Sequence, residues 1–177
     1  GCCQMFKYIA LLPLFAAQNV FASGTQSAIS LVKQYSTTVA CSINPASFKA
    51  VQTVGESGRE DVGDEYVVYW EGDIGCFGGN GSISGFLSVV RKNGFGQPLV
   101  EPYIKSPDIQ MVCADKIAVK NGLITLSGIT YDDDDSQNSP SKPIEVVFKT
   151  DDDKIKVVKK NLRPKAKISA ECVQNVR

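Results

Sequence analysis

The sequence contains acids, hydroxyls and cysteines but no histidine. Hydrolases with a Ser-His-Asp or Cys-His arrangement need an imidazole to take the proton of the nucleophile near neutral pH. Zinc, haem and non-haem iron sites that depend on histidine ligands are excluded for the same reason. The composition therefore excludes these enzymes and metal sites, and we expect a protein without a cofactor.

Pairs of carboxylates can cleave glycosides without histidine. The acidic residues here are concentrated in two runs, 132–135 and 151–153, which are flanked by polar residues typical of turns. A catalytic acid is buried so that its pKa rises, whereas residues in such turns are usually solvated. We therefore predict that the protein is not an enzyme, with a carboxylate-dependent hydrolase as an alternative.

The first acidic run is a weak candidate for calcium binding, because hard cations prefer several carboxylate and carbonyl oxygens. Its members are Asp132, Asp133, Asp134 and Asp135. An EF-hand loop that begins at Asp132 would need Gly at its sixth position and Glu at its twelfth, and the chain has Gln137 and Pro143 there. We interpret the run as a solvated turn.

A glycine-rich segment, 69–82, is the most unusual part of the chain. Glycine permits positive φ and close backbone approach, which favours a tight connection between two strands. A phosphate-binding loop would also need a Lys followed by Ser or Thr and then a helix, and a β-type sequence follows here. We predict a structural loop held by Cys76 that also serves as a binding loop. The binding candidates are Trp70, Asp73, Phe77 and Asn80.

Four cysteines, Cys41, Cys76, Cys113 and Cys172, lie after the apolar N-terminal stretch. An even number of cysteines in an oxidising compartment indicates two disulfides, with three possible connectivities. We favour a Cys41–Cys76 disulfide. A structural zinc site is disfavoured because the sequence has neither a C-x-x-C pair nor a histidine.

The N-terminal stretch has the three parts of a secretory signal. Reading from Met5, Lys7 supplies a positive charge, an apolar run of about ten residues follows, and Ala22 offers a cleavage site. That run is shorter than the roughly twenty residues a membrane-spanning helix needs. We predict a signal peptide over 5–22, preceded by an upstream remnant at 1–4, and hence a periplasmic or secreted protein with no membrane insertion after cleavage.

The remaining chain is long enough for one domain with a hydrophobic core. We predict a single β-rich domain at 23–160 and a basic C-terminal tail at 161–177. Removal of Lys7 leaves 18 of the 19 basic residues against 19 acidic ones, so the remaining chain is nearly neutral. Its net charge predicts no bulk attraction to nucleic acid or anionic lipid.

Hydrophobic periodicity predicts one helix, because Ala28, Leu31, Val32 and Tyr35 share one helical face within 26–35. Short strands separated by turn residues make up the rest. The expected strands are 50–54, 65–70, 82–91, 97–104, 116–120, 123–131, 144–149 and 154–159. The fold class is therefore α+β and β-rich, an antiparallel meander of about seven to nine strands with one N-terminal helix. A small β-barrel is the alternative.

Two turns give the clearest hairpin signals. Asn121 and Gly122 both tolerate the positive φ that a two-residue type I′ turn requires, and apolar residues alternate with polar ones on either side. The acidic run 151–153 separates two further strand-like segments, 144–149 and 154–159. We expect both pairs of segments to be antiparallel hairpins with one apolar face.

The glycine-rich segment resembles that of a group of uncharacterised exported proteins of Gram-negative bacteria. They share a W-x-G-D-x-G-C-x-G-G-x-G pattern, here Trp70, Gly72, Asp73, Gly75, Cys76, Gly78, Gly79 and Gly81. The likeness continues through Cys41, Pro45, Tyr131, Asp135, Pro140 and Ser141 and covers most of 23–177. It implies an exported location and a domain shape, without an established activity.

A weaker likeness is to small periplasmic inhibitors of C-type lysozyme, whose loops include an S-G-x-x-Y step that Ser127, Gly128 and Tyr131 match. We expect a non-enzymatic exported protein that binds a protein or an envelope component, because small disulfide-linked β domains commonly present loops to partners. An inhibitor or immunity protein against a cell-wall-degrading enzyme such as lysozyme is the alternative function.

Overall fold

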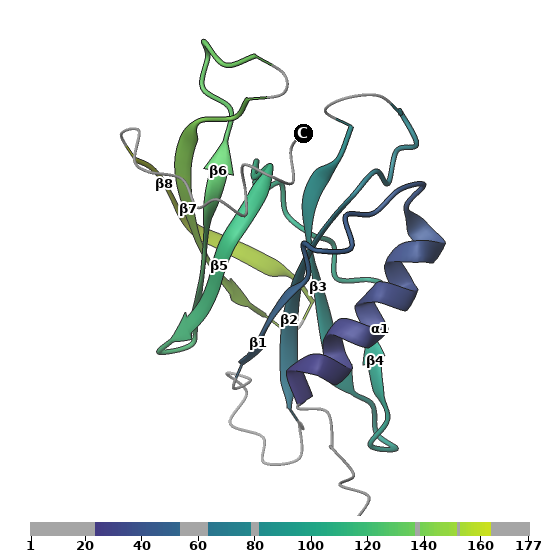
Figure 1. The fold of residues 1–177 in the computed structure, drawn as a ribbon. Coiled ribbons are helices and arrows are strands. Elements are labelled where there is room, and N and C mark those ends of the chain that lie inside the picture. The colour runs from purple at the N-terminus through teal and green to yellow at the C-terminus, as the bar shows by residue number, and fades with distance from the viewer. Residues whose placement is uncertain (1–23, 54–63, 79–81, 137–138, 152, 164–177) are drawn as a thin grey trace, which may run out of the picture.

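The computed structural model describes residues 24–53, 64–78, 82–136, 139–151 and 153–163, which form one helix and two antiparallel four-stranded sheets (Figure 1). The helix α1 spans Gly24–Val39 and precedes all strands. The strands are β1 Lys49–Thr53, β2 Glu65–Gly72, β3 Ser84–Lys92, β4 Pro98–Val100, β5 Cys113–Lys120, β6 Leu123–Thr130, β7 Lys142–Thr150 and β8 Ile155–Leu162.

Each sheet follows the order of the chain. Sheet A has the strand order β1-β2-β3-β4, and sheet B has the order β5-β6-β7-β8. The β5–β6 turn has φ of 51° at Asn121 and 72° at Gly122, which confirms the predicted positive-φ hairpin. The acidic β7–β8 turn is also confirmed as a hairpin, because the N–H of Asp151 donates to the carbonyl of Lys154 at 2.8 Å.

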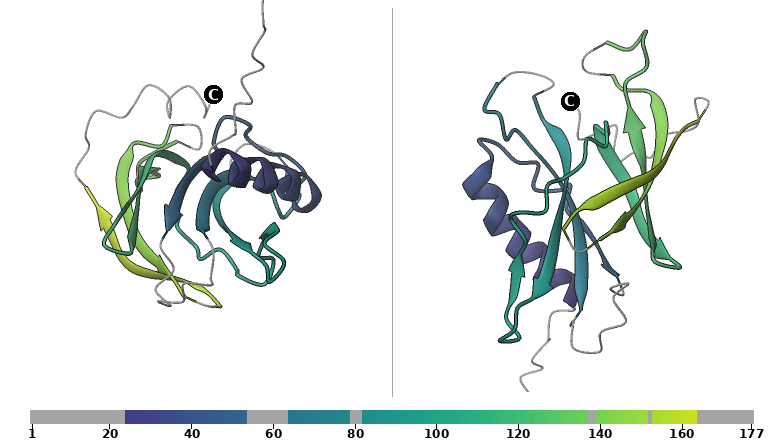
Figure 2. Two further views of the ribbon diagram at one scale, coloured as in Figure 1. Left: turned by 90° about the horizontal axis from the view of Figure 1, so that it is seen from below. Right: turned by 180° about the vertical axis from the view of Figure 1, so that it is seen from behind.

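The molecule has three layers, in which sheet A lies between α1 and sheet B (Figure 2). Strand residues alternate between the two faces of a sheet, so adjacent positions of β2 serve two different cores. Val68 and Trp70 pack against Ala28 and Val32 of α1. Val67 and Tyr69 belong instead to the core between the sheets.

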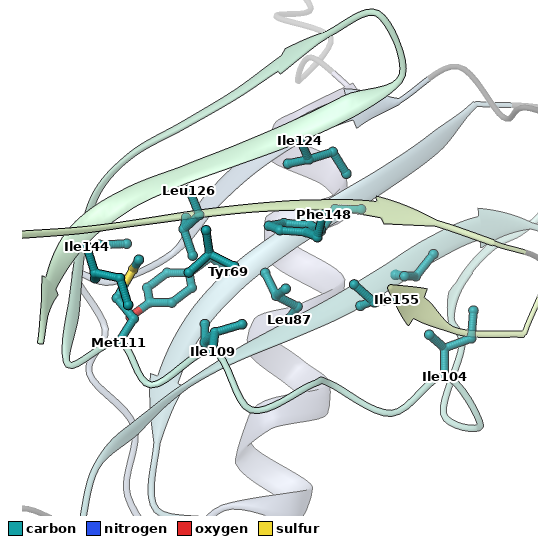
Figure 3. Close-up of a cluster of buried hydrophobic side chains, with 14 residues drawn as sticks. Tyr69, Leu87, Ile104, Ile109, Met111, Ile124, Leu126, Ile144, Phe148 and Ile155 are labelled. Carbon is teal, nitrogen blue, oxygen red and sulfur yellow. The ribbon is translucent and has the colours of Figure 1, made fainter. Parts of the chain in front are cut away.

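The core between the sheets holds the larger set of buried side chains (Figure 3). From sheet A it takes Tyr69 and Leu87, and from sheet B it takes Leu126 and Phe148, all at most 2 % exposed. Ile104, Ile109 and Met111 come from the segment that connects the sheets, so this connection is itself part of the core. Full burial of such side chains contributes about 1.5–3 kcal/mol each.

The predicted α+β class, the single helix in the described residues and the number of strands are confirmed. The meander is divided, however, and no closed barrel forms from the described strands. The division occurs where a strand was predicted at 97–104, since β4 ends at Val100 and the chain then crosses to sheet B. β8 extends to Leu162, so regular structure continues into the segment assigned to the tail.

Several expectations fall outside the described residues. These are the signal peptide, Asn80, Cys172 and the end of the tail. Within the part of the chain that is described, no helix is long and apolar enough to cross a membrane.

Candidate functional site

The glycine-rich loop begins at the end of β2 and is linked covalently to the chain that follows α1. Cys41 and Cys76 form a disulfide with a Cα–Cα distance of 5.3 Å, as the sequence favoured. The N–H of Cys41 donates to the carbonyl of Asp73, and the N–H of Asp73 donates to the carbonyl of Ser42, both at 2.9 Å. The residues after α1 therefore extend sheet A beside the loop and hold its first half.

The carboxylate of Asp73 organises the turn itself. Its oxygens accept the N–H of Gly78 at 3.0 Å and the N–H of Phe77 at 3.3 Å. The bond from Gly78 is the main cause that lowers the pKa of Asp73, and the bond from Phe77 adds to it, because both favour the ionised carboxylate. Asp73 is 3 % exposed, so its role in the loop is to hold the backbone rather than to contact a partner.

Phe77 is the side chain that this loop presents to solvent. Its exposed fraction is 86 %, although it lies next to the disulfide. A methyl group at Gly75 would overlap the Phe77 ring in its present position, and an exposed ring can rotate away from such a contact. Cys76 and Gly78 on either side both have positive φ, 54° and 65°, which turns the chain sharply around Phe77.

Trp70 does not belong to this exposed surface. The ring is 1 % exposed, packs on the α1 side of sheet A, and lies 5.0 Å from the Phe86 ring. Its Nε1–H donates to the hydroxyl of Ser88 at 3.0 Å, which satisfies the buried indole. The structural role predicted for Trp70 is thus observed, and the contact role is not available to a buried ring.

A shallow pocket of about 430 Å³ lies beside the loop. Apolar lining comes from Ile74, Phe77 and Phe86, and the hydroxyl groups come from Ser82 and Ser84. A second cavity of about 240 Å³ shares Ile74 and Phe86 with it and is bordered by the segment after β4. The loop therefore adjoins an apolar depression with a few polar groups, a form typical of binding surfaces.

Two buried glutamates were not anticipated from the sequence, and both lie on β2. Glu71 is 3 % exposed, and its carboxylate accepts the Tyr69 hydroxyl at 2.9 Å and the Asn44 side-chain amide at 2.7 Å. Burial is the main cause that raises the pKa of Glu71, and these hydrogen bonds oppose it. The backbone of Ala114 on β5 interacts with both Tyr69 and Glu71, so the cluster joins the two sheets.

We predict that Glu71→Gln weakens the pH dependence of stability. A raised folded-state pKa means that the stability contributed by protonated Glu71 is fully present below the ordinary pKa of Glu and is lost as pH rises through the folded-state value. Because Gln stays neutral, the variant does not lose this contribution. Its free energy of unfolding should therefore increase relative to that of the wild type as pH rises through this window. Urea unfolding at a series of pH values measures it, and parallel curves would contradict the prediction.

Glu65 occupies the other end of β2 and is 4 % exposed. Its Oε2 lies 2.6 Å from Nε of Arg91, and its Oε1 accepts the hydroxyls of Thr53 at 2.8 Å and Thr150 at 2.6 Å. Thr150 belongs to β7, so this cluster also joins the two sheets. Neither glutamate lines the two cavities beside the loop, and neither lines a third cavity, which lies beside Tyr131. Both carboxylates are thus engaged in structural bonds.

The acidic run after β6 is organised by its own hydrogen bonds. Asp135 accepts the N–H of Asp132 and the N–H of Ser141, each at 2.7 Å. Lys142 forms an ion pair with Asp132 at 2.7 Å. Within the described residues no group of three or more acidic or cysteine side chains is arranged to hold a metal ion. The geometry is that of a turn closed by Asp135.

Ser127 and Gly128, which suggested the inhibitor likeness, lie within strand β6 rather than in a loop. A methyl group at Gly128 would overlap the carbonyl of Cys113, so the close packing of β5 against β6 accounts for this glycine. Tyr131 follows the strand and lines a separate cavity of about 250 Å³. Cys113 is buried and disulfide-bonded.

No protein-family model, no curated protein and no solved structure matches the chain.

Proposed function

We propose that the chain is an exported, non-enzymatic protein that binds another protein or an envelope component through the loop that carries Phe77. The observation that carries the proposal is an aromatic ring with 86 % exposure on a loop fixed by a disulfide and by Asp73. Aromatic residues supply much of the energy of protein interfaces. A loop fixed before binding loses less conformational entropy when the partner is bound.

Two further observations support the proposal. A disulfide of this kind persists in oxidising compartments and is rare in the cytosol, which supports export. The apolar depression beside Phe77 offers further buried contact area around the ring. Binding rather than catalysis is supported because Glu65 and Glu71 are engaged in hydrogen bonds and lie outside the described cavities.

The partner can be trapped with a photoreactive benzoylphenylalanine in place of Phe77. Phe95 provides a matched control, since its ring is 92 % exposed on the turn between β3 and β4. We expect a discrete crosslinked product from native envelope material with the group at position 77 and none with it at position 95. Identical products at both positions, or none at position 77, would argue against this loop as the contact.

Phe77→Ala is predicted to weaken binding of the trapped partner by at least about 2 kcal/mol, roughly thirtyfold, as expected for an aromatic hot spot. Phe95→Ala should leave the affinity unchanged within error. Titration calorimetry with the identified partner measures both values. Because both rings are exposed, neither change should alter the folded structure, which circular dichroism checks.

A further inference from the structure

The chain has a net charge of zero, but its basic residues are unevenly distributed on sheet B. Ile124, Leu126, Ile144, Val146 and Phe148 of β6 and β7 all point into the core between the sheets. Residues alternate between the two faces of a strand, so the positions between these point away from sheet A. The strand register then identifies the outward positions of β5 and β8 as well.

Basic side chains occupy many of these outward positions. On β5, Lys120 lies opposite Leu123 and Lys116 lies opposite Ser127. On β8, Lys156 lies opposite Lys149 of β7, and Lys159 lies opposite Val147. The N–H of Arg163 donates to the carbonyl of Pro143, which continues the same register. We call this surface the basic face, formed by Lys116, Lys120, Lys149, Lys156, Lys159 and Arg163.

Few acidic groups neutralise the basic face. On the strands of sheet B, the acidic residues outside the core are Glu145, which pairs with Arg163 at 2.6 Å, and Asp115, which is exposed in the β5 bulge beside Lys116. Asp151 and Asp153 lie at the border, in the β7–β8 turn. Four exposed lysines, Lys116, Lys120, Lys156 and Lys159, form no ion pair with any described residue.

The arrangement of these lysines indicates the kind of partner. They lie on β5 and β8, the two outer strands of sheet B, which are three strand spacings or about 15 Å apart, and they line none of the described cavities. The outward residues of the sheet B strands include no aromatic ring on which a nucleobase could stack, which disfavours single-stranded nucleic acid. A broad basic surface fits a layer of negative charge.

We infer that the basic face binds an anionic membrane surface, with the lysines facing lipid phosphates. Each basic residue close to such a surface contributes about 1 kcal/mol of attraction, and the effect decays within a Debye length. The surface lies on a different sheet from Phe77, so a partner on the loop and a membrane on sheet B can be bound together.

Flotation of the full chain with lipid vesicles tests the inference. We expect the protein to float with vesicles of phosphatidylcholine and phosphatidylglycerol, and not with phosphatidylcholine alone. Binding should weaken as salt is raised above about 0.1 M, where the Debye length falls below about 10 Å. Equal flotation with both vesicle types, or no flotation with either, would overturn the inference.

A triple variant tests whether vesicle binding depends on the basic face or only on the total positive charge of the protein. Lys120→Gln, Lys156→Gln and Lys159→Gln together should weaken vesicle binding roughly a hundredfold, from about 1 kcal/mol for each residue. The matched control changes Lys33, Lys92 and Lys105 to Gln, which removes the same charge outside sheet B. Equal losses in both triple variants would overturn the inference, as would salt-sensitive binding to duplex DNA in place of vesicles.

The inference is independent of the proposed function. Phe77→Ala should leave vesicle binding unchanged, and the basic-face triple variant should leave photocrosslinking at position 77 unchanged. Failure of one experiment therefore does not decide the other.

Discussion

Replacing Arg91 by Met is expected to lower the free energy of unfolding by about 3–5 kcal/mol, the cost of leaving a buried charge without its partner. The Glu65 side chain is 4 % exposed, and Arg91 supplies the positive charge at 2.6 Å. Arg91 also donates to the carbonyl of Asp151 at 3.0 Å, so the change removes a second link between the sheets. Urea denaturation followed by circular dichroism measures the loss.

The neighbouring residue provides a control. Lys92 pairs with Asp64 at 3.4 Å, but both side chains are more than 40 % exposed, so Lys92→Met should change stability by no more than about 1 kcal/mol. Adding Glu65→Gln to Arg91→Met should restore much of the loss, because the amide oxygen still accepts the hydroxyls of Thr53 and Thr150. A double variant as unstable as Arg91→Met alone would show that the loss does not come from the unpaired charge.

Removal of the Cys41–Cys76 disulfide is the second change with a large expected effect. The Cys41→Ala, Cys76→Ala double variant should lose about 2–5 kcal/mol of stability, because a cross-link between residues 35 positions apart restricts the unfolded chain. Without it, the bonds of Asp73 alone hold the loop, so binding at Phe77 should weaken as well. Thermal unfolding and the crosslinking yield at position 77 measure the two effects.

These two effects can be separated. Asp73→Asn retains the disulfide but weakens the acceptor of the Gly78 and Phe77 amides. It should therefore accelerate amide hydrogen exchange within the loop while the remainder of sheet A stays protected. Unchanged binding by the disulfide-free variant would contradict the view that a fixed loop contributes to affinity.

The sequence alone predicted the helix, most strands and the β5–β6 and β7–β8 hairpins of sheet B. Periodicity of 3.6 residues in α1 and positive φ at Asn121 and Gly122 are local properties, so they can be read without knowing the fold. The pairing of Cys41 with Cys76 was favoured and is observed. Exclusion of histidine chemistry likewise needs only the composition.

Tertiary structure decided what no local pattern contains. The burial of Glu65 and Glu71 depends on sheet B, whose strands come much later in the sequence. The break of the meander after Val100 likewise depends on the packing of sheet B on sheet A. Exposure separated two aromatic residues of one segment, since Trp70 is covered by α1 and Phe77 is not.

Charge shows most clearly the difference between what the sequence determines and what the tertiary structure decides. Net charge follows from composition alone and predicted no attraction to anionic surfaces. The register of β5 to β8 places five lysines and Arg163 on one face, because alternate residues of a strand point the same way. The sequence thus determined which groups exist, and the long-range packing of the sheets decided which of them meet solvent together.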